Sequence, residues 1–163
     1  MTLTILATIV LLALAFDYIN GFHDTANAIA TVVSTGVLTA RDAIIMAAIL
    51  NFSGALIGVE VATTIAKGIA DSSQIVPSVV IAALVSAIAW NLITWYFGIP
   101  SSSSHALVGG LAGAVLAHGG PSVLHTEKLK EVATFLIVSP ILGFAIAMVL
   151  IISILWVVRH QPG

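Results

Sequence analysis

Residues 132–158 read VATFLIVSPILGFAIAMVLIISILWVV and contain no Asp, Glu, Lys or Arg. A longer stretch without these four residue types extends from Ser72 to Thr126. The hydrocarbon core of a bilayer is about 30 Å thick, and about 20 apolar helical residues cross it. The first stretch has room for one membrane crossing and the second for two. The sequence therefore predicts an all-α integral membrane protein.

The composition of the whole chain also indicates that a lipid bilayer surrounds the protein. Of 163 residues, 60% are hydrophobic, and only 5 Lys+Arg and 7 Asp+Glu are present. A soluble domain carries about 25% charged residues, so an ordinary soluble globule and a disordered chain are both excluded. The net charge of −2 offers no basic patch, so we expect a lipid bilayer and no nucleic acid as the surroundings. The absence of cysteine excludes a disulfide scaffold, a thiol enzyme and an iron–sulfur site.

Apolar segments separated by polar loops predict about four spanning segments. The first would be about 50 Å long as one helix, so a break between Asn20 and Asp24 is expected. The second begins with a capping-box-like pattern, Thr39 followed by Asp42. A short segment after Ser101–Ser104 cannot cross a bilayer and is expected to be a re-entrant or half helix. We expect one membrane domain over residues 1–163, with apolar segments at residues 2–35, 40–66, 78–97, 106–117 and 132–158.

The first polar insertion is Asn20-Gly21-Phe22-His23-Asp24-Thr25-Ala26-Asn27. On a helix that begins near His23, the side chains of Asp24, Asn27, Thr31 and Ser34 fall within about 80° of arc. Carboxylate, amide and hydroxyl oxygens are ligands that a hard cation prefers. An ionisable residue inside a span is costly and is a functional candidate. The alternative is an Asp that caps a helix beside packed polar neighbours.

The second polar insertion is Pro100-Ser101-Ser102-Ser103-Ser104-His105. Four hydroxyls and the free N–H groups of a helix start could face one volume, which would suit a tetrahedral oxyanion. The alternative is a Ser that caps a half helix, within a flexible serine run.

Apart from Arg41 at the start of the second segment, the apolar segments contain no Lys or Arg, so a doubly charged oxyanion at either insertion would be desolvated without a fixed counter-ion. Only His23 and His105 could become positive in these two insertions. A bound anion would need a cation that travels with it, and Asp24 would need one as well. The two insertions together predict cation-coupled anion transport, with no bound cofactor.

At these residues the chain resembles the inorganic phosphate transporter (PiT) family, whose hallmark is approximately G-A-N-D-V-A-N-A. The corresponding stretch here, from Gly21 to Ala28, reads GFHDTANA. Its His23 is similar to the bacterial low-affinity Pit branch, which places the chain in a cell membrane, expected to be the bacterial inner membrane. Similarity continues from Thr35 to Thr39 and from Lys67 to Ile69, and the serine run before His105 is similar to the second family signature.

The resemblance implies transport of inorganic phosphate with sodium, with protons or as a neutral metal–phosphate complex. It implies a cation site at Asp24 and Asn27, to which the helical stripe adds Thr31, and a proton or metal–phosphate role for His23 and His105. It implies phosphate binding by Thr25, Ser101, Ser102, Ser103 and Ser104. Asn51 stands where some sodium-coupled relatives carry Glu, which favours protons or metal–phosphate.

Family members contain two such halves in inverted topology, so the chain resembles an N-terminal half. It would then pair with a second half-transporter or form a homo-oligomer, because substrate sites of such folds lie between the repeats. Two alternatives compete with an active half: an inert or structural membrane fragment, and an intramembrane Ser/His hydrolase. The hydrolase is disfavoured because Ser104 and His105 are adjacent and their side chains diverge on one helix. We therefore expect no enzymatic activity.

Overall fold

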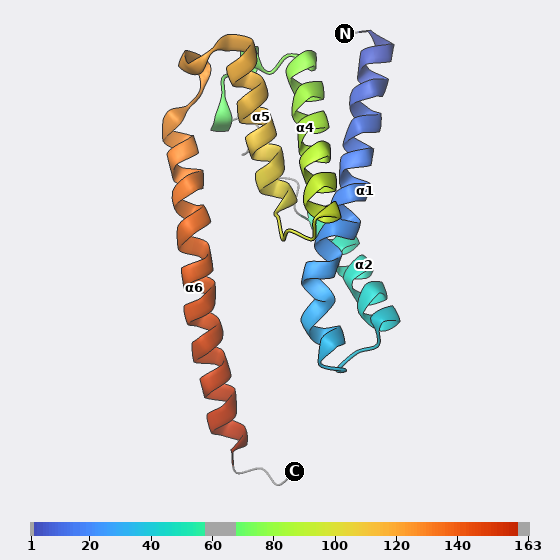
Figure 1. Cartoon of the computed structure of the whole chain (residues 1–163), viewed down its shortest axis with the longest axis vertical. Helices are drawn as coiled ribbons and strands as arrows, with labels where there is room; N and C mark the ends of the chain where they lie inside the picture. The colour runs from blue at the N-terminus through green and yellow to red at the C-terminus, as the bar shows by residue number, and fades with distance from the viewer. Residues whose placement is uncertain (1, 58–67, 160–163) are drawn as a thin grey trace. The chain divides into compact units, whose positions relative to one another are not determined.

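A computed structural model describes residues 2–57 and 68–159, and their regular structure is helical (Figure 1). The chain divides into two compact units, one ending at His125 and the other beginning at Thr126. The α-helices are α1 (Leu3–Ser34), α2 (Ala40–Ile57), α4 (Pro77–Tyr96), α5 (Ser103–Gly119) and α6 (Thr126–Val158). Two short 3-10 turns, η1 (Ser72–Gln74) and η2 (Pro121–Val123), flank α4 and α5. The predicted all-α class is confirmed for the described residues.

Helix α1 runs through its polar insertion without a break, so the interruption predicted between Asn20 and Asp24 is wrong. A continuous helix satisfies its backbone hydrogen bonds internally, which apolar surroundings require, and the polar side chains project from it. The Thr25 hydroxyl donates to the Gly21 carbonyl one turn earlier, so it too is satisfied on the helix. With 32 residues, α1 is about 48 Å long, which exceeds the bilayer core, and the excess requires tilt or protrusion.

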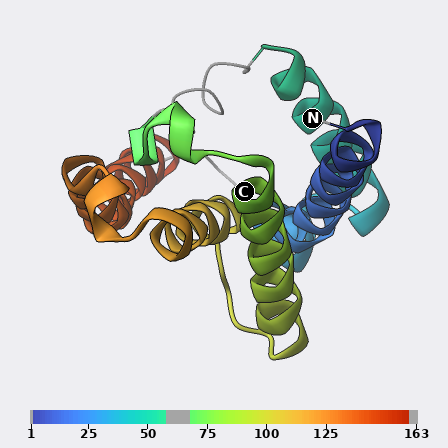
Figure 2. The ribbon, with the colours of Figure 1, turned by 90° about the horizontal axis from the view of Figure 1, so that it is seen from above.

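Helices α4 and α5 form an antiparallel pair, and α1 lies against α4 (Figures 1 and 2). Pro77 opens α4 at a position where its missing N–H is not needed. Phe16 of α1 packs on Leu84 and Ala87 of α4 in one buried cluster. At Gly110 of α5 a Cβ atom would lie 2.6 Å from Ser86 Oγ and 2.8 Å from the Ala83 carbonyl oxygen. Glycine at this position therefore lets the two helices approach closely.

Helix α5 begins at Ser103, inside the serine run, and has 17 residues. It is longer than the predicted segment at 106–117 because Ser102 acts as N-cap and accepts from the backbone N–H of His105 at 3.4 Å. At 1.5 Å per residue α5 measures about 25 Å, so it remains shorter than a bilayer core. The short helix expected after the serine run is confirmed.

The predicted capping box of α2 is also present. Thr39 Oγ1 accepts from the Asp42 N–H at 3.2 Å and donates to Asp42 Oδ2 at 2.7 Å. The expected remainder of this segment, residues 58–66, lies outside the described residues. So does Lys67, which carries part of the family resemblance.

Three of the described helices are long and apolar enough to cross a membrane: α1, α4 and α6. Helix α6 has 33 residues and contains Pro140. It starts at Thr126, before the expected span at 132–158, because its first turns carry the charged pairs Lys128–Glu131 and Lys130–Glu127. The lengths and apolar composition of these helices identify an integral membrane protein. Three candidate spans among the described residues agree approximately with the expected number of about four.

Candidate functional site

The two polar insertions meet in the tertiary structure. Ser103 Oγ, at the start of α5, donates to Asp24 Oδ2 of α1 at 3.2 Å. Ser103 is buried, with 1% of its surface exposed, whereas the Asp24 side chain is 46% exposed. The carboxylate predicted to bind a cation and the helix end predicted to bind an oxyanion are therefore in contact.

His23 is buried between α1 and α4, beside Asp24. Its Nδ1 lies 3.4 Å from Asp24 Oδ1, and its Nε2 lies 3.4 Å from Thr94 Oγ1. The Thr94 hydroxyl donates to the Trp90 carbonyl at 2.9 Å, with the Asn91 carbonyl at 3.1 Å as a second acceptor. A polar chain thus runs from α5 through α1 into α4. It gives Asp24 a neighbour that carries positive charge when protonated.

Thr94 and Asn91 are polar residues of α4 that the sequence reasoning did not assign to the site. Both are buried, and the Asn91 amide nitrogen and oxygen have no hydrogen-bond partner among the described residues. The sequence offered one signal for them, because both are polar residues within the stretch from Ser72 to Thr126 that contains no charged residue. Phe22 of α1, which precedes His23, contacts Trp95 of α4 edge-on, with ring centroids 5.6 Å apart.

The four serines do not face one volume. Ser101 and Ser102 line a hollow of about 620 Å³ between α4 and α5, together with His105 and Trp90. Trp90 Nε1 donates to Ser101 Oγ at 3.1 Å. Ser103 points instead to Asp24, and Ser104 is exposed and does not line the hollow. Ser103 and Ser104 are the first residues of α5 and point about 100° apart, whereas Ser101 and Ser102 precede the helix.

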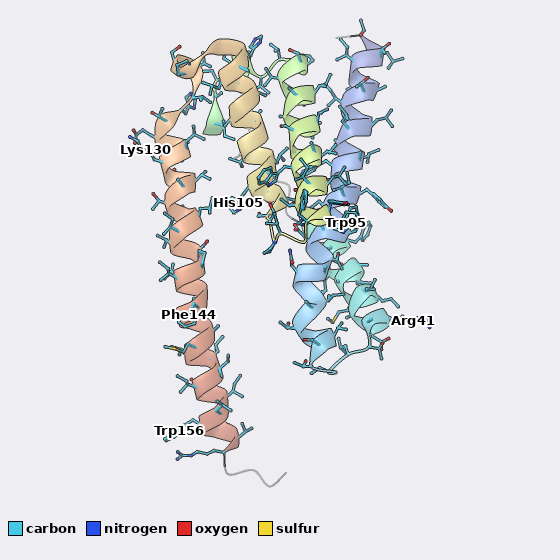
Figure 3. All side chains as sticks on the ribbon, viewed as in Figure 1. Arg41, Trp95, His105, Lys130, Phe144 and Trp156 are labelled. Atoms are coloured by element: carbon cyan, nitrogen blue, oxygen red, sulfur yellow. The ribbon has the colours of Figure 1, made fainter. Side chains whose placement is uncertain are left out.

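The rest of the hollow is formed by small side chains. His105 lies at the end of α5 that follows the serine run (Figure 3). Beyond this polar end, the walls come from Ala82, Ser86, Ala106, Gly109, Gly110, Gly113 and Ala114. The hollow therefore has one end rich in donors and one apolar end.

Three predicted site residues of α1 are not brought to the Asp24–Ser103 contact. The hydroxyl of Thr25 is used by the Gly21 carbonyl. Asn27 and Thr31 lie on exposed surface of α1, and within the described part of the chain neither side chain hydrogen-bonds to Asp24. The predicted polar stripe is present on α1, but its members Asn27 and Thr31 are exposed.

The charges of the site are few. Helices α1, α4 and α5 contain no Lys or Arg, so no fixed cation faces Asp24 from them. Within residues 2–57 and 68–159, no group of three His, Cys, Asp or Glu side chains could hold a metal ion. The oxygens at Asp24 and Ser103 are suited to a hard cation rather than to a closed transition-metal centre.

Known proteins resemble the chain over most of its length. A "Probable low-affinity inorganic phosphate transporter" of Bacillus subtilis is 55% identical over 150 residues, which are 91% of this chain and 44% of that protein. A protein of the same description from Streptomyces halstedii is 45% identical over 162 residues, 98% of this chain and 76% of that protein. These relatives are named as transporters and not as enzymes, so the hydrolase alternative is set aside.

A solved structure described as "The sodium-dependent phosphate transporter" superposes with a TM-score of 0.90 at 32% identity. It is matched over 99% of this chain and 42% of its own length. The chain thus spans about half the length of several of the proteins that it matches. Residues 20–162 match the family model described as "Phosphate transporter family". The resemblance expected from the two motifs is confirmed, and the chain belongs to the phosphate transporter family.

Proposed function

We propose that the chain is one half of a secondary transporter that moves inorganic phosphate across the membrane together with a cation. The hydrogen bond from Ser103 to Asp24 carries this proposal, because it joins the helix start at which an oxyanion would bind to a carboxylate that no Lys or Arg of α1, α4 or α5 neutralises. The relatives are described as probable low-affinity inorganic phosphate transporters, which supports the proposal.

Phosphate would bind at the polar end of the hollow. The hydroxyls of Ser101 and Ser102 lie there, and the start of α5 adds backbone N–H groups and the positive end of the helix dipole. Because Ser101 accepts from Trp90, its own hydroxyl hydrogen remains available for a phosphate oxygen. We assign phosphate to Ser101 and Ser102, with His105 beside them, and not to Thr25 or Ser104.

The cation would bind at Asp24. A phosphate near the start of α5 and the Asp24 carboxylate repel each other, and no Lys or Arg of α1, α4 or α5 separates them. A cation on Asp24 removes that repulsion, which links the two binding steps. The solved relative is described as sodium-dependent, whereas His23 in place of Asn favours a proton or a metal–phosphate complex.

The chain would pair with a second half of the transporter or with a second copy of itself. Asn27 and Thr31 lie on open surface beside Asp24, and the chain spans less than half of its Bacillus subtilis relative. A second half that covers this face would add Asn27, one turn from Asp24, to the cation site, whereas Thr31 lies about 10 Å along the helix and is too far away to share a cation with Asp24. Residues 1–163 would then be one repeat and one membrane domain of the complete transporter.

The test is uptake of radiolabelled phosphate into proteoliposomes that contain the chain alone or with a second half. Separate arms impose a sodium gradient, a proton gradient, or magnesium with phosphate. We expect Asp24→Asn to abolish coupled uptake, because the cation loses its charged ligand. Asp17→Asn, on an exposed part of the same helix, is the matched control and should retain uptake. Coupled uptake at the wild-type rate in Asp24→Asn would refute the cation role.

The phosphate site is tested in the same vesicles. A hydrogen bond to a charged group contributes about 1.5–3 kcal/mol, so Ser102→Ala should raise the phosphate KM by about 10- to 100-fold. Ser104→Ala, which changes an exposed hydroxyl outside the hollow, should leave KM unchanged. Equal KM values in the two variants would contradict the phosphate assignment. Absence of uptake in every arm, with or without a second half, would favour the inert fragment.

A further inference from the structure

Three buried polar atoms of α1 and α4 have no hydrogen-bond partner in the described part of the chain. They are Asn20 Oδ1 on α1 and both side-chain atoms, Oδ1 and Nδ2, of Asn91 on α4. Asn91 is completely buried, with 0% of its surface exposed. Buried polar groups are almost always paired, because an unpaired one is costly, so these three atoms require a physical explanation.

Two contacts fix the register of α1 against α4. Helix α1 runs alongside α4 in the same direction (Figures 1 and 2). Phe16 of α1 lies in one buried cluster with Ala87 of α4. Further along both helices, His23 Nε2 lies 3.4 Å from Thr94 Oγ1. Both pairs are 71 positions apart in the sequence, so the helices keep one register between these contacts.

Asn20 and Asn91 are separated by the same number of positions. On each helix the asparagine lies four residues after the first contact and three residues before the second, which is the spacing of one helix face. The two amides therefore form one layer between the contacts. The Asn91 nitrogen is a donor and the Asn20 oxygen is an acceptor, so the unpaired groups are complementary, although they do not bond to each other here.

The backbone of α1 is continuous at this layer, but two features make it easier to bend. Gly21 follows Asn20, and a Cβ added to it would meet nothing within 4 Å. Unlike Gly110, it is not explained by close packing, and glycine lowers the stability of a helix. The Gly21 carbonyl also accepts from the Thr25 hydroxyl, and such bonds to the preceding turn often bend helices.

We propose that α1 bends at Gly21 during transport and that Asn91 Nδ2 donates to Asn20 Oδ1 in the second conformation. This rests on the proposed function, to which it adds a conformational step. The unpaired amides destabilise the described conformation and the hydrogen bond stabilises the other, which keeps the two close in free energy, as a reversible cycle requires. Asp24 follows Gly21 on α1, so the bend moves the proposed cation ligand relative to the first half of the helix.

The first experiment compares stability with transport rate in the same variants. Gly21→Ala fits without a clash and strengthens the straight helix. Asn91→Leu removes the unpaired amide from the described conformation. Both variants should raise the Tm of the purified chain in detergent. Both should also lower the maximal rate of phosphate uptake in proteoliposomes, Gly21→Ala by about fivefold and Asn91→Leu by about three- to tenfold, with the phosphate KM unchanged.

Gly54→Ala is the matched control for the change at Gly21. Gly54 lies in α2, and a Cβ added to it also meets nothing within 4 Å. This variant should raise the Tm as much as Gly21→Ala and leave the uptake rate unchanged. Combining Asn20→Leu with Asn91→Leu should slow uptake no more than the slower single variant, because each change removes the same hydrogen bond.

The second experiment detects the approach of the two residues without transport. The chain contains no cysteine, so Asn20→Cys with Asn91→Cys introduces two thiols and no others. A disulfide forms only when the two Cα atoms come within about 7 Å, so the rate of oxidation by copper phenanthroline in detergent reports how often the layer closes. Adding Gly21→Ala should slow this cross-linking about fivefold, whereas adding Gly54→Ala should leave it unchanged.

Three results would overturn the inference: wild-type uptake rates in Gly21→Ala and Asn91→Leu, a loss of Tm together with the loss of rate, or cross-linking that Gly21→Ala does not slow. If Asp24→Asn abolishes coupled uptake while both of these variants keep the wild-type rate, the transport proposal stands and the bend is refuted. If no arm shows uptake, the proposed function fails, and the cross-linking rates still decide whether α1 bends at Gly21.

Discussion

The contact between α4 and α5 predicts opposite effects for two neighbouring glycines. At Gly110 an added Cβ would lie 2.6 Å from Ser86 Oγ and 2.8 Å from the carbonyl oxygen of Ala83, and the second atom is backbone that cannot rotate away. At Gly109 an added Cβ meets nothing within 4 Å. Both glycines lie inside the same helix, so Gly→Ala gives both the same gain in helix propensity and only Gly110 suffers the clash.

The magnitudes follow from these two terms. Replacing a helical Gly by Ala is favourable by about 0.8–1 kcal/mol. Overpacking of a close contact costs about 1–3 kcal/mol. Gly109→Ala should therefore raise the free energy of unfolding by about 1 kcal/mol. Gly110→Ala should lower it by about 0–2 kcal/mol, so that the two variants differ by about 1–3 kcal/mol.

The assay is thermal unfolding of the two purified variants in the same detergent, followed by far-UV circular dichroism. For a chain of this size, 1 kcal/mol corresponds to about 2–4 °C in Tm. We expect Gly110→Ala to unfold below the wild type and Gly109→Ala slightly above it. A Tm for Gly110→Ala equal to or above that of Gly109→Ala would refute the close packing of α5 on Ala83 and Ser86.

Two further predictions concern polar groups of α4. Asn91 is fully buried and its amide has no partner among the described residues, so Asn91→Leu, which has the same branching and number of side-chain heavy atoms, should raise the free energy of unfolding by about 1–3 kcal/mol in the same assay. A lower stability would contradict an unpaired amide at this position. Trp90→Phe removes the indole donor to Ser101 and should raise the phosphate KM several-fold in vesicles while the cation requirement stays constant. A changed cation requirement with an unchanged KM would contradict the placement of Trp90 at the phosphate end.

The helices whose positions are predicted well are those determined by local signals. The sequence predicts the third segment at 78–97, and α4 is Pro77–Tyr96, because Pro77 and Gly98 bound an uncharged run. The capping box of α2 depends on two residues three positions apart, so it too can be predicted from the sequence.

Predictions differ from the structure where polar residues suggest that a helix is interrupted or has not yet begun. The polar insertion at Asn20 to Asp24 suggests a broken helix, but side chains can be polar while the backbone of α1 keeps its own hydrogen bonds. The short helix at the serine run was predicted correctly, but its expected bounds, 106–117, were too narrow, because α5 already begins at Ser103. In both cases hydropathy reports the side chains and not the backbone path.

The sequence by itself determined that the chain is an all-helical membrane protein with two polar insertions, because the transfer of charge into lipid restricts where helices can span. The residues of the two insertions carried the resemblance to the phosphate transporter family. Only the tertiary structure decided which atoms of the insertions meet. The Ser103–Asp24 and Thr94–His23 contacts join residues 79 and 71 positions apart, and no local pattern specifies them. They exist because α1 and α5 pack near one another around α4, and the rotation of each helix sets which side chain faces inward. That rotation separates Ser103, which faces the carboxylate, from Ser101 and Ser102, which face the hollow.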